Sequence, residues 1–234
     1  MRRHLLYFAM DFKTVLRDRQ NRLYAAARLR GDLVCLAGTR QDIFCCEGAV
    51  LNVREKARLM DEAAVNRALM RLSHEIAERN RGVENVCLVG IRRRGEPMAR
   101  QIRSNIIKIE GLEVPCGSVD VRYYRDDLQR LSQEPIVTKA QPDFPVADKT
   151  VVLVDDVLYT GRTARAAMEA VLACGRPRAI QLAVLVDRGH RELPIRADYV
   201  GKNVPTSHAE LIEARLPEYD GETGVYLMEL GGSD

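Results

Sequence analysis

The sequence predicts an α/β fold with a mostly parallel central sheet flanked by helices. Short apolar runs recur at residues 86–89, 151–154 and 179–186. Segments in which apolar residues recur at helical spacing lie between these runs. The runs are apolar throughout and do not alternate with polar residues. Parallel strands that are buried on both faces produce this pattern, because helices cover either side of such a sheet.

Composition and charge are those of an ordinary globular protein. The 234 residues are 46% hydrophobic and 29% charged, with a formal net charge of +3. That excess is too small to indicate a nucleic-acid partner by itself. No apolar run is long enough to cross a bilayer, and the apolar stretch before Asp11 is too short for a secretion signal. We therefore expect a cytoplasmic protein with no membrane partner.

The six cysteines predict neither a disulfide framework nor a zinc site. They contain no C-x-x-C pair and no cysteine–histidine set at zinc-ligand spacing. Several fall inside apolar segments, where a free cysteine behaves as a small hydrophobic residue. Reduced thiols in a reducing compartment are the expected state.

A change in character near residue 57 divides the chain. Residues 1–57 are rich in arginine, and between Phe12 and Leu29 they show some helical periodicity without strong caps. We expect residues 1–57 to form an N-terminal extension that is poorly packed or disordered. An added RNA-binding arm, or an upstream stretch translated from too early a start, are the alternatives. Residues 58–234 have the regular pattern of a folded domain.

The first predicted helix follows Asp61, a favourable N-cap, and ends before Gly82. Its polar face carries Arg67, Arg71 and His74 at spacings of four and three residues. Such a face is usually only solvated, although it also suits an anionic partner.

The remaining elements follow in order. A strand at 86–89 leads through the loop Gly90-Ile-Arg-Arg-Arg-Gly95 into a helix that Glu96-Pro97 opens. A polar segment, 122–149, is too long for a plain connection and is typical of a functional lid. The other predicted elements are strands near 114–121, 150–154, 179–186, 197–200 and 224–229, and a helix over 162–173 that ends at Gly175.

The segment 151–163 is the best candidate for a binding site. Two carboxylates, Asp155 and Asp156, end an apolar strand, and a turn with Thr160 and Gly161 precedes a helix. Ligands of α/β sheets bind at the carboxyl ends of strands, and amides at a helix N-terminus bind anions. The carboxylates suit ribose hydroxyls or hydrated magnesium. One loop therefore offers donors for a phosphate and acceptors for a sugar; the alternative is that the two aspartates only cap the helix.

Residues 151–163 resemble the 5-phosphoribosyl-1-pyrophosphate (PRPP) motif of the type I phosphoribosyltransferases, which has four apolar residues, two acidic residues and a Thr-Gly turn. The likeness covers roughly residues 58–229. Within the family, the chain is most similar to proteins that combine uracil phosphoribosyltransferase activity with regulation of pyrimidine operons. Four segments carry this likeness: 61–80, 86–95, 123–128 and 184–207. The resemblance implies a type I phosphoribosyltransferase fold over residues 58–234, with a flexible hood.

The resemblance also implies roles for individual residues. Asp155 and Asp156 would hold the ribose hydroxyls, and Thr160, Gly161, Arg162 and Thr163 the 5′-phosphate. Arg92, Arg93 and Arg94 would bind pyrophosphate, over which Tyr124 and Arg125 of the hood would close. Val186, Asp187 and Arg188 would select uracil, and Asp187 would orient a magnesium-bound water. The catalytic set would be Asp155, Asp156 and Arg125.

The implied reaction joins uracil to PRPP and yields UMP and diphosphate, with Mg²⁺ as cofactor. Charge grows on the leaving diphosphate while the ribose becomes cationic, so electrostatic stabilisation would carry the catalysis. The reaction needs no covalent nucleophile. The resemblance further implies a homodimer or tetramer.

A second implied activity is binding of a hairpin in the mRNA leader of the pyrimidine operon, with UMP tuning the affinity and attenuation as the outcome. The candidate RNA-binding residues are Arg67, Arg71, His74, Arg188, His190, Arg191, Arg196 and Lys202. Two residues depart from the family pattern, in which threonine often stands at the position of Arg93 and a small hydroxyl residue can stand at that of Met70. A base-salvage phosphoribosyltransferase without an RNA role is therefore the main alternative. A regulator without catalysis is a weaker one, because Asp155, Asp156 and Thr160 are intact.

Overall fold

The computed structural model describes residues 53–121 and 142–229 in full, and the backbone of the strands at 8–10, 13–17, 23–29, 32–37, 42–45, 50–52 and at residue 230. The strands are β1 (Phe8–Met10), β2 (Lys13–Arg17), β3 (Leu23–Leu29), β4 (Asp32–Ala37), β5 (Asp42–Cys45), β6 (Val50–Met60), β7 (Val86–Ile91), β8 (Cys116–Val119), β9 (Thr150–Leu158), β10 (Ala179–Asp187), β11 (Tyr199–Asn203), β12 (Glu210–Arg215) and β13 (Gly224–Leu230). The helices are α1 (Glu62–Asn80), α2 (Gly95–Glu110), α3 (Arg162–Cys174) and α4 (Pro217–Asp220). Tyr124 and Arg125 lie outside the described residues.

The chain forms two compact units. The first contains residues 1–57 with 208–211 and 227–234, and the second contains 58–207 with 212–226. Strands β1 to β5 belong to the first unit and pair with their neighbours in antiparallel fashion. They continue an eight-stranded sheet of order β1-β2-β3-β4-β5-β6-β13-β12.

The helical periodicity expected between Phe12 and Leu29 is wrong, because β2 and β3 occupy that range. Leu29 pairs with Asp32 in a tight antiparallel register, and Gly31 between the two apolar runs favours a hairpin over a helix. How well residues 1–57 pack stays a prediction, since their side chains up to residue 52 lie outside the described part.

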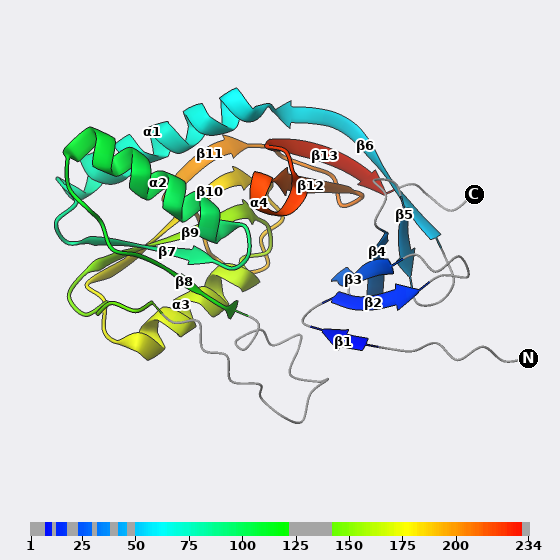
Figure 1. Ribbon diagram of the computed structural model, residues 1–234, viewed down its shortest axis with the longest axis horizontal. Helices are drawn as coiled ribbons and strands as arrows, with labels where there is room; N and C mark the ends of the chain where they lie inside the picture. The colour runs from blue at the N-terminus through cyan, green and yellow to red at the C-terminus, as the bar shows by residue number, and fades with distance from the viewer. Residues whose placement is uncertain are drawn as a thin grey trace, which may run out of the picture. The chain divides into compact units, whose positions relative to one another are not determined.

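The second unit has the three layers that the sequence predicts. Its sheet has the order β11-β10-β9-β7-β8, and every pair in it is parallel. Helices α1 and α2 cover one face and α3 covers the other (Figure 1). The predicted fold class, a mostly parallel sheet flanked by helices, is therefore confirmed.

Two hydrophobic cores explain why the central strands are apolar throughout. Leu88 of β7 and Val152 of β9 pack with the side chains of α1 and α2. Their neighbours Cys87 and Leu153 point the opposite way and pack with α3. Successive side chains of a strand alternate between faces, so a strand between two helical layers needs apolar residues at every position.

The helix ends follow the predicted caps closely. Asp61 is the N-cap of α1, and its carboxylate accepts a hydrogen bond of 2.7 Å from the amide of Ala64. Gly175 ends α3, as expected. Strand β9 runs four residues beyond its predicted end at Val154, and thus includes both aspartates. Strand β12 and the short helix α4 were not predicted.

The order of the strands places the expected ligand site. After β7 the chain adds β8 on one side, and after β9 it adds β10 and β11 on the other. The direction of winding thus reverses between β7 and β9, and α/β proteins bind ligands at the carboxyl edge of such a switch point.

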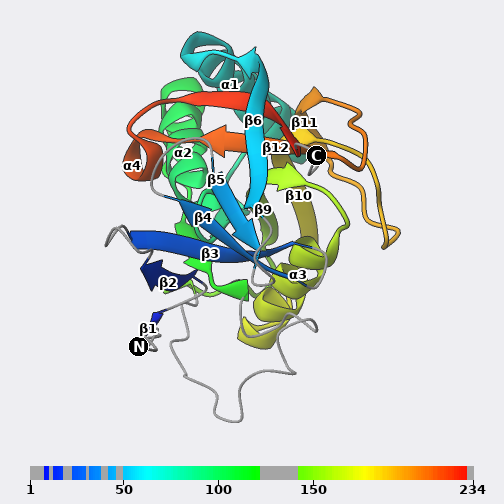
Figure 2. The ribbon, with the colours of Figure 1, turned by 90° about the vertical axis from the view of Figure 1, so that its right-hand side faces the viewer.

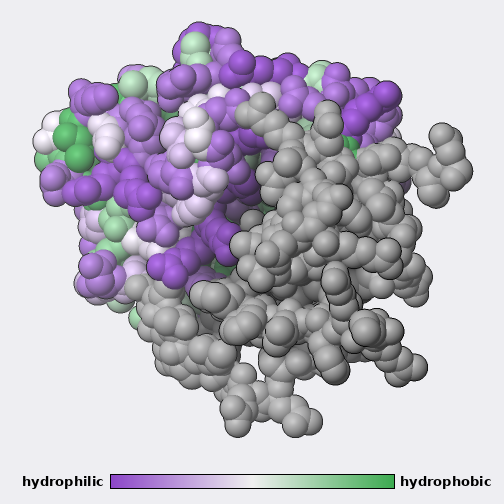
Figure 3. All heavy atoms as spheres, turned by 45° about the vertical axis from the view of Figure 1, so that its right-hand side comes forward, coloured by the Kyte–Doolittle hydropathy of each residue, from purple (hydrophilic) through white to green (hydrophobic). Residues whose placement is uncertain are grey.

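The described surface suits polar ligands. Its exposed large hydrophobic residues are Leu112, Leu172 and Tyr219. The face in Figure 3 is accordingly hydrophilic over most of its described area. No helix in the described residues is long and apolar enough to cross a membrane.

Candidate active site

Three loops follow the carboxyl ends of adjacent parallel strands. The arginine loop, Arg92–Arg94, follows β7; the anion loop, Tyr159–Gly161, follows β9; and the β10–β11 loop spans residues 188–198. Val154 of β9 is aligned with Gly90 of β7 and with Ala183 of β10. The three loops therefore leave the sheet at the same edge.

The anion loop presents the amino end of α3. Gly161 is the N-cap residue and has φ of 93°, a backbone conformation that other residues rarely adopt. The first turn of α3 contains no acidic residue, and the N-cap Gly161 has no side chain to cap it. Its amides and positive dipole end thus suit an anion. The Thr160 hydroxyl lies beside them and accepts a hydrogen bond of 3.3 Å from the amide of Arg162.

The β10–β11 loop bonds to the anion loop and fixes its conformation. The amides of Glu192 and Leu193 donate to the carbonyl oxygen of Thr160 at 3.0 and 3.1 Å. The side chain of Glu192 pairs with Arg162 at 2.6 Å. The arrangement fixes the backbone of the loop, so its amides are oriented before any ligand binds.

Asp155 and Asp156 lie half-buried near the end of β9. Oδ1 of Asp155 accepts from the amide of Asp156 at 3.0 Å, and Oδ1 of Asp156 accepts from the amide of Val157 at 2.9 Å. Because Gly161 is the N-cap of α3, neither aspartate caps that helix. Burial, and secondarily the charge of Asp156, raise the pKa of the Asp155 carboxyl well above its usual range. Among the described residues neither carboxylate pairs with a basic side chain, and a strongly shifted pKa beside a second carboxylate is typical of a binding site.

The residue after the arginine loop packs against β9 directly before these carboxylates. A Cβ atom on Gly95, the residue that follows the loop, would lie 2.1 Å from the carbonyl oxygen of Val154 and 3.3 Å from Cα of Asp155. Only glycine permits this approach. The peptide bond between Arg92 and Arg93 is cis. The arginine loop and the aspartate pair therefore lie at the same edge of the sheet, and the roles expected for these residues stay predictions.

The three arginines of the loop differ in their surroundings. Arg92 and Arg93 are exposed, and Arg92 lies 3.6 Å from the Glu96 carboxylate. Arg94 is partly buried and pairs with Asp220 at 3.1 Å. The predicted pyrophosphate ligands thus divide into two exposed cations and one that the protein itself holds.

The residues predicted to select uracil are mostly engaged within the protein. The side chain of Val186 is fully buried in the core, so only its backbone can meet a base. The carboxylate of Asp187 pairs with Arg191 and accepts from the amide of Gly189 at 3.0 Å.

Arg188 is 4% exposed. It donates to Thr206 Oγ1 at 3.0 Å, and its guanidinium lies 4.1 Å from the centre of the Tyr159 ring. It therefore joins the β10–β11 loop to the anion loop. No sequence pattern near Tyr159 indicated this contact.

The predicted RNA-binding residues fall into two groups. Arg67, Arg71 and Lys202 line one pocket of about 310 Å³, together with Leu59, Met60, Ala64, Ala68 and Gly201. Arg67 and His74 are exposed on α1, and Arg196 is exposed on the β10–β11 loop. Within the pocket, Lys202 donates to the carbonyl oxygen of Leu59 at 2.9 Å.

The second group points into the protein. Arg191 donates to the carbonyl oxygens of Tyr159 at 2.7 Å and Ile195 at 2.9 Å, and Arg188 is buried as described above. His190 contacts the carbonyl oxygen of Thr206 through Nε2. These three side chains stabilise the loops at the sheet edge, and they contribute less to a basic surface than the sequence suggested.

The carboxylates at the carboxyl edge of the parallel sheet provide only part of a magnesium site. Among the described residues, no three histidine, cysteine, aspartate or glutamate side chains cluster closely enough to hold a metal. Magnesium bound with a phosphorylated substrate, however, needs only one or two carboxylates, because phosphate oxygens and water supply the other ligands. Asp155 and Asp156 meet that requirement. Asp187, already paired with Arg191, meets it less well.

Two thiols lie in the sheet: that of Cys87 is buried, and that of Cys116 is half-buried. Burial raises the pKa of the Cys87 thiol to about 11, and it also raises the pKa of the Cys116 thiol. Both stay protonated near neutral pH, so neither is a reactive nucleophile.

Comparisons with known proteins identify the family. The model of the phosphoribosyl transferase domain matches residues 57–215. A protein of Clostridioides difficile named bifunctional protein PyrR is 62% identical over 175 residues, which are 75% of this chain and 99% of that protein. A protein of the same name from Acetivibrio thermocellus is 56% identical over 176 residues, 75% of this chain and 96% of the relative.

Solved structures confirm the fold. The hypoxanthine phosphoribosyltransferase of Trypanosoma cruzi aligns with a TM-score of 0.58 at 15% identity, over 76% of this chain and 98% of its own. That of Staphylococcus aureus aligns with a TM-score of 0.55 at 21% identity, over 76% and 93%.

The fold, the paired loops and the family match together define a phosphoribosyltransferase. The chain belongs to the PyrR family of phosphoribosyltransferases, which confirms the resemblance noted in the sequence.

Proposed function

We propose that the chain transfers the phosphoribosyl group of PRPP to uracil, and that it regulates pyrimidine genes by binding an mRNA leader in response to UMP. One observation supports the enzyme assignment above the others. Gly95, the residue after the arginine loop, packs against the β9 backbone directly before Asp155, so the cations of the loop and the aspartate pair lie at the same edge of the sheet.

The anion loop would hold the 5′-phosphate. The amides at the start of α3 and the hydroxyls of Thr160 and Thr163 supply its donors, with Gly161 allowing close approach. Asp155 and Asp156 would accept hydrogen bonds from the 2′- and 3′-hydroxyls of the ribose. The raised pKa of Asp155 fits this role, because hydroxyl donors of the substrate would stabilise a carboxylate charge that burial and Asp156 disfavour.

The arginine loop would hold the diphosphate, with Arg92 and Arg93 as its exposed cations. Tyr124 and Arg125 would close over it and exclude water from a reactive sugar carbon. When bound, Mg²⁺ supplies positive charge to the leaving diphosphate. The carboxylates beside the ribose would stabilise the positive charge that develops there. The backbone near Val186 and Asp187 would select the base.

A coupled assay tests the enzyme function. Purified protein with PRPP, magnesium and uracil should form UMP and diphosphate, and hypoxanthine should be a poor substitute. Asp156→Asn should lower kcat/KM at least about 100-fold while the circular dichroism spectrum stays unchanged. Full activity in that variant would refute the assigned site.

The RNA function is supported by the basic pocket between α1 and β11. Arg67, Arg71 and Lys202 converge on it, and Arg67 and His74 extend the positive face along α1. Clusters of this kind bind phosphate without reading sequence, so the specificity for a leader hairpin would come from additional contacts.

A gel-shift experiment with the chain's own pyrimidine-operon leader, with and without UMP, tests regulation. Binding that UMP strengthens would support the bifunctional assignment. Activity without binding at low salt would favour a base-salvage enzyme, and binding without activity a pure regulator. A cytoplasmic location and a homodimer or tetramer accompany the proposal, and sedimentation at several protein concentrations tests the oligomer.

A further inference from the structure

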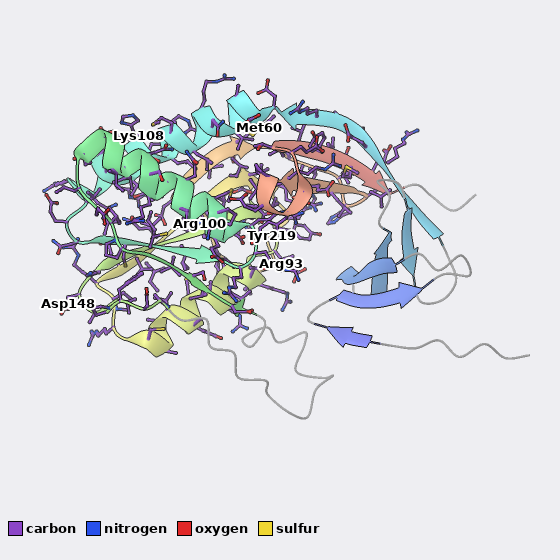
Figure 4. All side chains as sticks on the ribbon, viewed as in Figure 1. Met60, Arg93, Arg100, Lys108, Asp148 and Tyr219 are labelled. Atoms are coloured by element: carbon purple, nitrogen blue, oxygen red, sulfur yellow. The ribbon has the colours of Figure 1, made fainter. Side chains whose placement is uncertain are left out.

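The short helix α4 contacts the arginine loop from the far end of the sequence. It begins after Leu216 and lies beside the amino end of α2 in both views of the molecule (Figure 1 and Figure 2). Two consecutive residues of α4 reach two consecutive residues of the loop. Tyr219 and Arg93 accordingly lie next to one another in Figure 4.

The first contact is an ion pair. Nη2 of Arg94 donates to Oδ1 and Oδ2 of Asp220 at 3.1 and 3.2 Å. Side-chain exposure is 34% for the arginine and 20% for the aspartate, so water screens the pair less than it screens a surface pair. Oδ2 of Asp220 also accepts from the amide of Leu216 at 3.0 Å, which fixes the carboxylate against its own helix.

The second contact holds the backbone of the loop. The hydroxyl of Tyr219 donates to the carbonyl oxygen of Arg93 at 3.3 Å. Tyr219 is 47% exposed, and it is one of the few large apolar side chains on the described surface. Its position is explained by the hydrogen bond of its hydroxyl group more readily than by burial of its ring.

Arg94 is unsuited to bind diphosphate in this arrangement. Its Nη2 faces Asp220, and its Nε is buried without a hydrogen-bond partner in the described part of the chain. Binding a ligand anion would require the ion pair to break and the side chain to turn. Arg92 and Arg93 are exposed, and Arg92 makes only a longer contact of 3.6 Å with the Glu96 carboxylate.

We propose that Asp220 and Tyr219 are positioning residues for PRPP, which hold the arginine loop so that Arg92 and Arg93 face the diphosphate while Arg94 serves as the anchor. The inference rests on the proposed function and assigns the three arginines different tasks. It also gives α4 a supporting role in PRPP binding, although Asp220 lies 126 residues after Arg94 in the sequence.

Variants at the two contacts test the inference. Asp220→Asn should raise KM for PRPP and the inhibition constant of diphosphate between about 5- and 50-fold, with KM for uracil nearly unchanged. Asp220→Glu should restore part of the loss. Tyr219→Phe removes one hydroxyl from an exposed ring, so it should fold normally and shift the same two constants by a smaller factor. The double variant Asp220→Asn with Arg94→Lys should lose no more than the larger single loss, because both residues act through one contact.

Asp198→Asn is the matched control. Asp198 pairs with Arg79 at 2.8 Å and its side chain is 26% exposed. It is the last residue of the β10–β11 loop, where the chain has already crossed to the amino end of β11 at the opposite edge of the sheet, so it takes no part in the site. This variant should leave both PRPP constants unchanged. Unchanged constants in both Asp220→Asn and Tyr219→Phe would overturn the proposal. So would equal losses in kcat, KM for PRPP and KM for uracil, since such losses indicate only a weakened fold.

Direct titration separates this inference from the proposed function. PRPP with magnesium is titrated calorimetrically into the wild type and the variants, without uracil. If the wild type binds no PRPP, the proposed function fails and the inference with it. If the wild type binds PRPP and the variants bind it equally well, only the inference fails.

Discussion

At the scale of single residues, the carboxyl group of Asp155 is placed where water reaches it poorly and Asp156 repels its charge. Its raised pKa means that the folded state binds a proton more tightly than the unfolded chain does. The pKa of this carboxyl is about 4 in the unfolded chain and higher in the folded protein. The free energy of unfolding therefore falls as the pH rises from the first value through the second. The free enzyme is less stable near neutral pH than it would be without this charge.

Asp155→Asn should thus stabilise the free protein while it impairs the reaction. We expect a gain of about 1 kcal/mol in the free energy of unfolding at pH 8. The gain should be smaller at pH 5, because the raised pKa lets the wild-type carboxyl take up a proton at higher pH than an ordinary aspartate does. Urea denaturation at both pH values measures the difference.

The exposed Asp143 offers a control for that measurement. Asp143→Asn should change the free energy of unfolding little at either pH. A loss of stability in Asp155→Asn at pH 8 would show that the carboxylate is favourably paired in the free protein, contrary to its surroundings here.

A second prediction for a single residue concerns Gly95. A methyl group there would meet the carbonyl oxygen of Val154 at 2.1 Å, so Gly95→Ala must displace either α2 or β9. We expect a loss of about 3 kcal/mol in the free energy of unfolding. Gly111→Ala, which has open space and only a positive φ of 69°, should lose about 1 kcal/mol. Equal losses in the two variants would argue against the close contact.

The sequence predicted some site residues well and others poorly. Asp155, Asp156 and Thr160 were found from local chemistry, because a strand, two carboxylates and a turn are contiguous. Arg188 and Arg191 looked like surface cations, and their burial depends on carbonyl groups that only the folded loops bring near. The partnership of Arg94 with Asp220 spans 126 positions and has no local signal at all.

At the scale of elements, the first turns of α1 combine a buried face with a basic one. Val65, Ala68 and Leu69 are buried, whereas Arg67 is exposed and lines the pocket beside β11. Removing the charge of Arg67 should therefore leave the core intact and weaken only the binding of a polyanion.

We expect Arg67→Ala to weaken leader RNA binding at moderate salt and to reduce the slope of log affinity against log salt by about 1. Gel shifts at several salt concentrations measure both effects. Lys108→Ala is the control, because it removes one exposed charge from the last turn of α2, at the other end of the helical layer from Met60 in Figure 4. Equal losses in both variants would mean that net charge alone governs binding.

Strong periodicity and caps predicted the larger elements of the second unit. Helix α1 began at its predicted cap, and α3 ended one residue beyond its predicted range. Strand β12 was missed because Glu210-Leu-Ile-Glu-Ala-Arg215 alternates only weakly, and α4 because four residues are too few for a periodic signal. Strand β9 was cut short at Val154, because carboxylates are unfavourable in strand interiors and signalled a loop.

At the scale of the whole molecule, the chain contains a phosphoribosyltransferase domain and an N-terminal segment that the family model does not match. The family model matches residues 57–215, so residues 1–56 lie outside that match. The predicted boundary near residue 57 stays a prediction about how independently the two parts behave.

Limited proteolysis of the intact chain tests that boundary. We expect early cleavage before residue 58, with phosphoribosyltransferase activity retained in the digest. Mass spectrometry of the products locates the cut, and the UMP assay follows activity over the same time course. Protection of residues 1–57, or loss of activity in step with the first cut, would show that the extension is integral to the enzyme.

The neighbouring aspartates have one consequence for the thermodynamics of binding. If ribose hydroxyls and a magnesium-bearing substrate favour the ionised form of Asp155, then binding PRPP must expel the proton that this carboxyl holds in part of the free molecules. The released proton is taken up by the buffer, so the apparent binding enthalpy should vary linearly with the ionisation heat of the buffer. The slope should be smaller in Asp155→Asn than in the wild type, because the variant has no proton to release at this position. PRPP should then bind the wild type more tightly as the pH rises through the raised pKa of Asp155.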